Sequence, residues 1–342
     1  MKKLNIETAS LDELISHLRE MTHYQSSDYE RLRDLLGETH LRKRLQGQLR
    51  LYGMEHPLWI KAVLRIRRRC IRQIILTGLW SLGLLSRARM LARNPEIVER
   101  EIELPNLPET FEGYRILHLS DFHFDFIPEL PEIVENLLSG VTFDLCVLTG
   151  DFRGETTGPY EESLDHLART RPALGEKVVA VLGNHDNVEI MLRLPEMGIP
   201  VLMNQCMKLE RDGSSILLGG IDDPHFYRTH NFSLMKTEVE AAPVSILLSH
   251  SAESYREAAE AGFDVQLSGH THGGQLCLPG GIPVLAHLHD CPRRMIRGAW
   301  SHRQLQGYTS RGIGSSTLDV RLCCPPEATV HVLHRNNLIS RA

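Results

Sequence analysis

Five short motifs rich in aspartate and histidine are the residues of this sequence best suited to chemistry. They are Asp121-Phe122-His123, Gly150-Asp151, Gly183-Asn184-His185-Asp186, Ser249-His250 and Gly269-His270-Thr271-His272. Carboxylate, amide and imidazole groups form a mixed oxygen and nitrogen ligand set, which suits Mn, Fe, Zn or Co better than Ca or Mg. A carboxylate such as Asp151 can bridge two cations about 3.5–4 Å apart. No cysteine lies among the motifs, so we do not expect a closed structural zinc site.

Short apolar segments precede the motifs and must position them. The segments are 114–120, 145–149, 178–182, 244–248 and 265–268. Segments of this length that are rich in β-branched residues are typical of buried strands. Because ligand sites in open α/β folds lie at the carboxyl ends of strands, we expect the motifs to converge on one sheet edge. Successive residues of a strand point to opposite faces, so Asp121 and His123 should share a face and reach one ion together.

In this order, the motifs resemble those of the calcineurin-like metallophosphoesterase superfamily, which read D-x-H, G-D, G-N-H-D/E, H and G-H-x-H. The resemblance extends from about Leu104 to the end of the chain. It implies two divalent ions, for which we expect manganese first and iron, zinc or cobalt as alternatives. The ligands it implies are Asp121, His123, Asp151 and His272 for one ion, and Asp151, Asn184, His250 and His270 for the other. It also implies that His185 is the catalytic histidine and that Asp186 orients its ring.

Three further segments are similar to a bacterial branch of this superfamily that holds small membrane-associated phosphodiesterases. They are Gly269–Gln275, Ser310–Gly314 and Cys324–Glu327. The branch includes enzymes that resemble UDP-2,3-diacylglucosamine pyrophosphatases of lipid A synthesis. The chain departs from the pattern at Phe124-Asp125-Phe126, because many members have glycine two residues after the first histidine. A bulky and charged segment there could narrow or recharge the approach of the substrate.

The expected chemistry is hydrolysis by metal-activated hydroxide. Two ions would lower the pKa of a bridging water toward ~7 and neutralise phosphate oxygens. His185 could give a proton to the leaving oxygen. Arg311, in a glycine-flanked loop, is either a phosphate clamp or an ordinary surface arginine. The loop at 276–297 is rich in Pro and Gly, as lids often are, and its His287 and His289 are candidate substrate contacts.

The chain of 342 residues has room for one large domain and a smaller unit. We predict a helical N-terminal extension at 1–97 and a catalytic domain at 98–342. Strands that alternate with helices predict an α/β domain, and the resemblance implies a four-layer αββα sandwich. The seven cysteines include no C-x-x-C pair and their number is odd, which argues against a disulfide framework. A reducing cytoplasm is therefore the expected location.

A basic segment at 56–95 contains no acidic residue, although the chain has 43 of them. Its apolar residues recur at helical spacing, which predicts an amphipathic helix. The uncharged stretch from Ile74 to Leu85 is shorter than the ~20 residues needed to span a bilayer, so we expect the segment to lie at an anionic membrane surface. The alternatives are packing on its own domain or on a partner. We do not expect nucleic acid as a partner, because the acidic remainder would repel it.

These observations support three hypotheses of function. The first is a phosphoesterase, peripheral on the inner face of the cell membrane, that hydrolyses a phosphodiester or pyrophosphate bond in a lipid-linked substrate such as UDP-2,3-diacylglucosamine. The second is a soluble nucleotide phosphodiesterase or phosphatase, whose activity would survive deletion of residues 1–95. The third is a metal-stabilised protein-binding module without turnover, in which His185→Ala would change nothing measurable.

Overall fold

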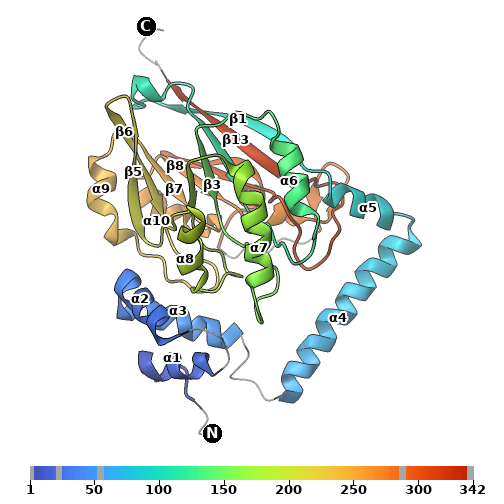
Figure 1. Cartoon of the computed structure of the whole chain (residues 1–342). Coiled ribbons are helices and arrows are strands. Elements are labelled where there is room, and N and C mark those ends of the chain that lie inside the picture. The colour runs from blue at the N-terminus through green and yellow to red at the C-terminus, as the bar shows by residue number, and fades with distance from the viewer. Residues whose placement is uncertain (1–3, 21–24, 52–57, 285–289, 337–342) are drawn as a thin grey trace.

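Two β-sheets that face each other, with helices on their outer sides, build most of the molecule (Figure 1). The computed structural model describes residues 4–20, 25–51, 58–284 and 290–336. The helices are α1 (Leu11–Arg19), α2 (Ser26–Leu36), α3 (Glu38–Leu51), α4 (Leu58–Ser81), α5 (Leu85–Ala92), α6 (Leu130–Leu138), α7 (Glu161–Thr170), α8 (Ile190–Arg193), α9 (Lys236–Ala241) and α10 (Tyr255–Glu260).

The first sheet has five strands, in the spatial order β1 (Glu96–Leu104), β13 (Glu327–Arg335), β2 (Arg115–Leu119), β3 (Leu145–Leu148) and β4 (Val178–Ala180). The second has six, in the order β11 (Gly298–His302), β12 (Leu305–Thr309), β8 (Val265–Ser268), β7 (Ser245–Leu248), β6 (Ser214–Gly220) and β5 (Gln205–Arg211). A short ribbon pairs β9 (Cys277–Leu278) with β10 (Ile282–Pro283). Strands β2 to β4 run parallel to one another, as do β6, β7, β8 and β12, so within each set the carboxyl ends lie at one edge.

The hydrophobic core has one layer between the sheets and one on each outer face. Between the sheets, Val147 of β3 and Leu267 of β8 belong to one buried cluster. On the outer face of the first sheet, Leu148 packs in a cluster with residues of α6 and α7. On the outer face of the second, Leu247 clusters with residues of α9 and α10. The layers therefore run helix, sheet, sheet, helix, and the predicted αββα sandwich is confirmed.

The first three helices pack on the body that the two sheets form. Ser10 caps α1, because its hydroxyl accepts from the backbone N–H of Glu13 while the Glu13 carboxylate accepts from the N–H of Ser10. Leu14 of α1 and Leu45 of α3 are fully buried, in the cluster that also contains Val188 before α8. The helices thus share a core with the domain. Strand β1 begins at Glu96, near the division at 97/98, which stays a prediction.

Helix α4 projects from the body and meets it near its C-terminal end (Figure 1). There Leu79 packs with Ala88 of α5 and with Leu318 and Val320. Among the described residues, no single helix is long and apolar enough to cross a bilayer, whereas the segments Arg69–Ser81 and Leu85–Ala92, bent by 112°, meet that test as a pair. The sequence predicted helix over 56–95, and α4 and α5 occupy most of its described part.

Two histidines buried between the sheets should make stability depend on pH. His118 of β2, with Nε2 2.9 Å from Thr149 Oγ1, and His331 of β13 are nearly inaccessible to solvent. Burial lowers the pKa of His118 to about 3 and also lowers the pKa of His331. In the unfolded chain both titrate near pH 6.5. The folded state therefore excludes protons that the unfolded state binds below that pH.

We expect the free energy of unfolding to fall as the pH drops from about 6.5 toward 3, by up to about 1.4 kcal/mol per pH unit for each histidine. Urea unfolding in the presence of chelator, at several pH values, would measure this dependence. In His118→Gln, which can keep the bond to Thr149, the loss of stability at low pH should be smaller. An identical pH dependence in this variant and the wild type would contradict the prediction.

Candidate metal centre

The five motifs follow the carboxyl ends of five strands, three in the first sheet and two in the second, and meet at one edge of the two sheets. Asp121 follows β2, Asp151 follows β3, Asn184 and His185 follow β4, His250 follows β7, and His270 follows β8. The sequence prediction that these residues converge is confirmed by the distances between their side chains, which bring Asp and His residues into three overlapping groups.

The prediction that strand alternation brings Asp121 and His123 together is wrong. Strand β2 ends at Leu119, so the alternation of a strand does not place them. Both have a positive φ, 56° for Asp121 and 43° for His123, as do Asp151 (56°), His270 (72°) and His272 (51°). Non-glycine residues in this left-handed region cost on the order of 1–3 kcal/mol each and concentrate at functional sites. Sharp turns of the backbone after the strands therefore aim these side chains inward.

Two glycines near the centre are required by close approach of the chain. A Cβ atom on Gly269 would lie 1.9 Å from Ser120 Oγ and 2.3 Å from Asp121 Oδ2. A Cβ atom on Gly314 would lie 1.8 Å from the carbonyl oxygen of Phe122. Any side chain at either position would push the backbone away from the loop that carries Asp121.

The first group of possible ligands consists of Asp121, His123 and His272, all buried. The two imidazole Nε2 atoms lie 3.0 Å apart, and His272 Nε2 lies 3.5 Å from Asp121 Oδ1. His123 Nδ1 lies 2.9 Å from the carbonyl oxygen of Arg153. Since a carbonyl can only accept a hydrogen bond, Nδ1 carries the proton and the lone pair of Nε2 faces the centre.

The second group consists of Asp151, His250 and His270, and a third, made of His123, Asp151 and His185, overlaps both. His250 Nε2 lies 3.2 Å from His270 Nδ1 and 2.9 Å from Asn184 Oδ1, while His250 Nδ1 donates to the carbonyl of Thr149 at 2.7 Å. Asp151 Oδ2 lies 3.3 Å from His250 Nε2 and 3.6 Å from His123 Nε2. One carboxylate oxygen therefore reaches both groups, as a bridging ligand must.

The charges of these groups fit a cation site. Burial lowers the pKa of His123 to about 4 and holds those of His270 and His272 well below their usual range, so these rings are neutral at pH 7, as metal ligands have to be. Burial opposes ionisation of Asp151, but the neighbouring charges of His250 and His185 outweigh it and keep the Asp151 pKa well below normal. Burial opposes the charge of His250, but the neighbouring Asp151 and Asp121 carboxylates raise its pKa to about 10, so a metal ion would take the place of that proton.

His185 differs from the other histidines of the motifs because its ring is partly open to solvent. Its side chain is 21 % exposed, whereas that of His123 is 0 % exposed. His185 Nδ1 lies 2.6 Å from the carbonyl oxygen of Gly154, which fixes the ring, and Nε2 lies 4.0 Å from Asp151 Oδ2. His185 is thus placed at the mouth of the centre, where it can meet a substrate.

Asp186 does not orient the ring of His185, contrary to the sequence prediction. Its carboxylate accepts from the backbone N–H groups of Gly183 and Asp151, both at 2.8 Å, and of Phe152, at 2.9 Å. The Asp186 carboxylate bonds to the backbone because three converging N–H groups stabilise its charge better than one distant imidazole ring would. Asp186 therefore ties the loop after β4 to the loop that carries Asp151.

We expect Asp186→Asn to weaken metal binding by roughly 10–100-fold, the usual loss when a group that supports a ligand is changed. The amide has only one acceptor oxygen for the three N–H groups, so the Asp151 backbone should lose its fixed position. Competition with a chelator of known affinity measures the change. Asp34→Asn, at an exposed position of α2, is the control. Equal affinity in Asp186→Asn and wild type would contradict this role.

Arg311 is not a free phosphate clamp. Its guanidinium makes ion pairs with Glu327 and Glu96, and its side chain is 14 % exposed. Arg321, which the sequence did not single out, is fully buried and donates to the carbonyl oxygens of Arg311, at 2.7 Å, and His272, at 3.3 Å. Arg321 thereby holds the loop around 311–314 against the end of the last motif. Nothing in its sequence spacing distinguishes it from a surface arginine.

The remaining predicted substrate contacts are placed as follows. His287 and His289 lie outside the described residues. Asp125, expected to change the charge of the substrate approach, accepts hydrogen bonds from the Ser163 hydroxyl and the Glu155 N–H, and so turns toward α7 and the segment before it. Phe126 stays beside the site, with its ring centre 6.2 Å from that of His123.

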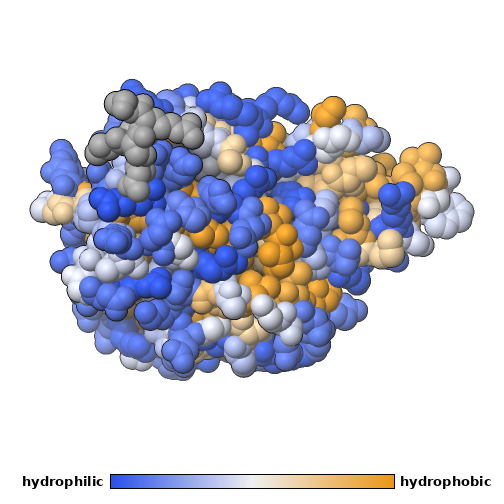
Figure 2. Space-filling model, turned by 90° about the horizontal axis from the view of Figure 1, so that it is seen from above, coloured by the Kyte–Doolittle hydropathy of each residue, from blue (hydrophilic) through white to orange (hydrophobic). Residues whose placement is uncertain are grey.

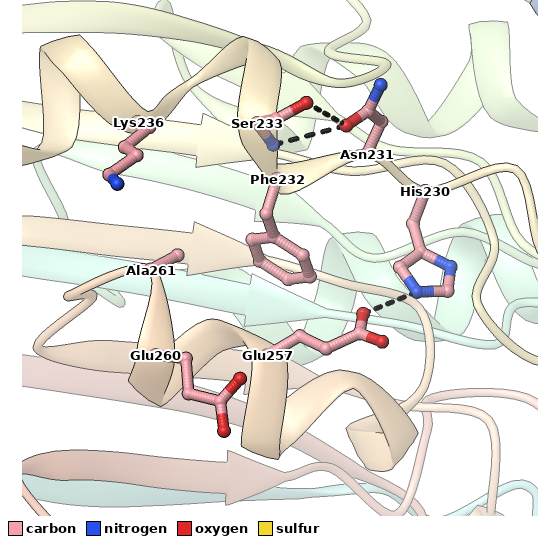
Figure 3. A pocket seen from close by; sticks show the side chains of 8 residues that line it. All are labelled: His230, Asn231, Phe232, Ser233, Lys236, Glu257, Glu260 and Ala261. Atoms are coloured by element: carbon pink, nitrogen blue, oxygen red, sulfur yellow. Dashed lines mark hydrogen bonds and ion pairs between the residues drawn. The ribbon is translucent and has the colours of Figure 1, made fainter.

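A hollow of about 410 Å³ lies apart from the motifs, against α9 and α10 (Figure 3). Phe232 and Lys236 line it, and His230 pairs with Glu257 at its side, with 2.6 Å between His230 Nε2 and Glu257 Oε2. None of its lining residues belongs to the five motifs, so the candidate centre is a site of convergent ligands at the sheet edges and not this hollow.

Comparison with known proteins agrees with this geometry. Residues 114–274 match the model of the calcineurin-like phosphoesterase family. The uncharacterized metallophosphoesterase YkoQ of Bacillus subtilis is 30% identical over 225 residues, which are 63% of this chain and 82% of that protein. Phosphodiesterase YaeI of Escherichia coli is 28% identical over 64% of this chain and 81% of its own.

A transmembrane protein with metallophosphoesterase domain from Danio rerio is 31% identical over 78% of this chain and 63% of that protein. The family match spans all five motifs and begins at residue 114, after the N-terminal helices. The chain belongs to the calcineurin-like phosphoesterase family and is therefore a hydrolase of phosphoester bonds.

Proposed function

We propose that this protein uses two divalent metal ions, manganese first among them, to hydrolyse a phosphodiester or pyrophosphate bond. The observation that carries the proposal is the position of Asp151, whose Oδ2 lies within 4 Å of imidazole nitrogens from both groups of ligands. One ion would be held by Asp121, His123, Asp151 and His272, and the other by Asp151, Asn184, His250 and His270. Such ions polarise phosphate oxygens and make water acidic enough to supply a nucleophile near neutral pH.

The protein's own side chains would hold the ions and serve the leaving group. Asp151 stays ionised between the two groups, and the rings of His123, His270 and His272 stay neutral at pH 7. His250 would have to lose its proton before it could bind a metal ion. His185 is held by the Gly154 carbonyl, with Nε2 4.0 Å from Asp151 Oδ2. From there it would stabilise a phosphate oxygen or give a proton to the leaving oxygen, a contribution of roughly 10²–10⁴-fold. The name of YaeI supports a diester substrate.

We further propose that the substrate is lipid-linked and that α4 and α5 bind the inner face of the cell membrane. Val63, Ile66 and Ile74 share a face of α4 and are more than half exposed, and Trp80 and Leu82 at the corner with α5 are 71% and 72% exposed. Figure 2 shows apolar surface on the projecting end of the molecule. The Danio rerio relative is named as a transmembrane protein, which supports a membrane location.

Charge favours an anionic membrane surface over a partner protein. The described residues of α4 and α5 include exposed Arg67, Arg69, Arg72 and Arg87, and neither helix contains an acidic residue. Each such cation near an anionic surface adds about 1 kcal/mol of attraction. Exposed tryptophan and leucine beside arginine are the residue types that insert at the headgroup level.

We expect the double variant Trp80→Ser, Leu82→Ser to lose at least about tenfold in binding to anionic phosphatidylglycerol vesicles, because the burial of each side chain is worth roughly 1.5–3 kcal/mol. Co-sedimentation measures the binding. Leu234→Ser, which changes another exposed leucine far from α4 in sequence, is the matched control. Membrane binding is contradicted if the wild type does not bind vesicles at low salt, or if the double variant binds as well as Leu234→Ser.

The substrate proposal is tested with UDP-2,3-diacylglucosamine in detergent micelles, by following UMP release with Mn²⁺, with chelator, and with His185→Ala. Release that needs both metal and His185 supports it. If a bis-aryl phosphodiester is cleaved but the lipid is not, the reaction stands and the soluble nucleotide enzyme becomes the better hypothesis. If neither substrate is cleaved, the protein is a binding module.

A further inference from the structure

The side chain of Arg44, on α3, is fully buried behind the loop that follows β4. Its Nη2 donates to the carbonyl oxygen of Asp186 at 2.9 Å and is 3.4 Å from that of Gly183. Its Nη1 lies 3.2 Å from Asp222 Oδ1, and its guanidinium carbon lies 3.4 Å from the centre of the Tyr227 ring. One residue of the N-terminal helices thus joins the loops that follow β4 and β6, strands of different sheets.

The two carbonyls that Arg44 meets stand at the ends of the Gly-Asn-His-Asp motif. Between them lie Asn184, whose Oδ1 is 2.9 Å from His250 Nε2, and His185, which is at the mouth of the centre. The Asp186 carboxylate also ties the same loop to the backbone of Asp151. The loop is therefore held from two directions, once from within the domain and once from the N-terminal helices.

The guanidinium of Arg44 is also held by the Asp222 carboxylate, and this contact is compatible with its hydrogen bonds to the two carbonyl oxygens. Burial alone would raise the pKa of Asp222, but Arg44 and His40 hold it at about 2, so a buried carboxylate balances the buried guanidinium. His40 Nε2 lies 2.8 Å from Asp222 Oδ2, and Thr229 also bonds to that carboxylate. A planar guanidinium can meet a carboxylate and backbone carbonyls at the same time, which an ammonium group cannot do with the same geometry.

Attachment of the helices does not depend on this contact. The apolar side chains of α1 and α3 enter the domain's hydrophobic cluster, and Gln48 and Tyr29 both bond to Glu189, at 2.9 Å in each case. These interactions dock the helices without touching residues 183–186. Among the described side chains of the N-terminal helices, it is Arg44 that reaches the carbonyl oxygens of the Gly-Asn-His-Asp motif.

We propose that the N-terminal helices complete the active site and that Arg44 is a positioning residue, which fixes the loop carrying Asn184 and His185 relative to the metal ligands. This inference rests on the proposed function for its effect on rate. It adds a requirement that the five motifs do not contain, because the segment that supplies Arg44 lies outside the region matched by the family.

The test compares Arg44→Lys and Arg44→Met with Arg42→Met in the full-length protein. Arg42 is on the same helix, but it donates to the carbonyl of Ala9 at 3.0 Å and so stays within the N-terminal helices. Arg44→Lys keeps the charge beside Asp222 and should fold even where Arg44→Met does not. Two readouts are needed: kcat and KM on a bis-aryl phosphodiester with Mn²⁺, and hydrogen–deuterium exchange of peptides that contain 183–187.

We expect both Arg44 variants to lower kcat by roughly 10–100-fold with little change in KM, as when groups that support metal ligands are lost. Exchange in 183–187 should become faster in them and stay unchanged in Arg42→Met. If folded Arg44→Lys keeps both the wild-type kcat and the wild-type exchange, the inference is overturned. If the wild type has no activity, the proposed function fails, and the exchange measurement still decides whether Arg44 fixes the loop.

Discussion

Replacement of Asp151 by asparagine should remove stable binding of both metal ions and lower kcat by at least about 10³-fold, the upper range for loss of one electrostatic group at an active site. The Asp151 carboxylate lies within 3.6 Å of a histidine from each group of ligands, and its Oδ1 also accepts from the backbone N–H of His185 at 2.9 Å. An amide at this position carries no charge and offers one acceptor oxygen. Two cations would then face several neutral imidazoles and too little negative charge.

Metal content measured by mass spectrometry, together with steady-state kinetics, would follow both effects in the same preparation. Asp165→Asn, an exposed aspartate on α7, serves as the matched control and should keep metals and activity. The bridging role of Asp151 would be refuted by a variant that retains two ions per chain and the wild-type rate.

Replacement of His185 by alanine should have a different result, with two metal ions retained and kcat lowered by roughly 10²–10⁴-fold. The structure places its ring at the mouth, held by the Gly154 carbonyl, with Nε2 4.0 Å from the bridging carboxylate. Removal of the ring leaves the buried ligands in place. It takes away the group that would serve the leaving oxygen.

His334→Ala, at a histidine that pairs with Glu112 far from the centre in the fold, is the control. Kinetics and metal content together distinguish the possible outcomes. Loss of metal in His185→Ala would make the residue a ligand instead of a proton donor. Full activity with full metal content would show that the reaction does not use His185.

The strand pattern predicted an α/β domain, the family resemblance implied its four layers, and the motifs predicted the side chains that meet at the candidate metal centre. Apolar segments such as 145–149 and 244–248 became strands β3 and β7, and residues after strand ends meet because parallel strands share an edge. Motif order therefore predicts which side chains converge. It does not predict backbone angles, and the left-handed conformations of Asp121 and His123 replaced the strand alternation we had expected.

Side-chain partners were the harder part, because they depend on contacts between distant segments. Asp186 follows His185 directly in sequence, yet its carboxylate bonds to the backbone at Asp151, 35 positions away. Arg311 was a candidate clamp until the fold brought Glu96, 215 positions away, to its guanidinium. Arg44 gave no sequence signal, since its partners lie on loops of two different sheets.

The most direct test of the central claim is a titration of metal-free protein with Mn²⁺, in which bound metal and hydrolysis of a bis-aryl phosphodiester are measured together. We expect activity to appear as the second ion binds, to reach its maximum at two ions per chain, and to be abolished by chelator. Hydrolysis that is indifferent to metal, or two bound ions with no turnover of any phosphoester, would contradict this claim.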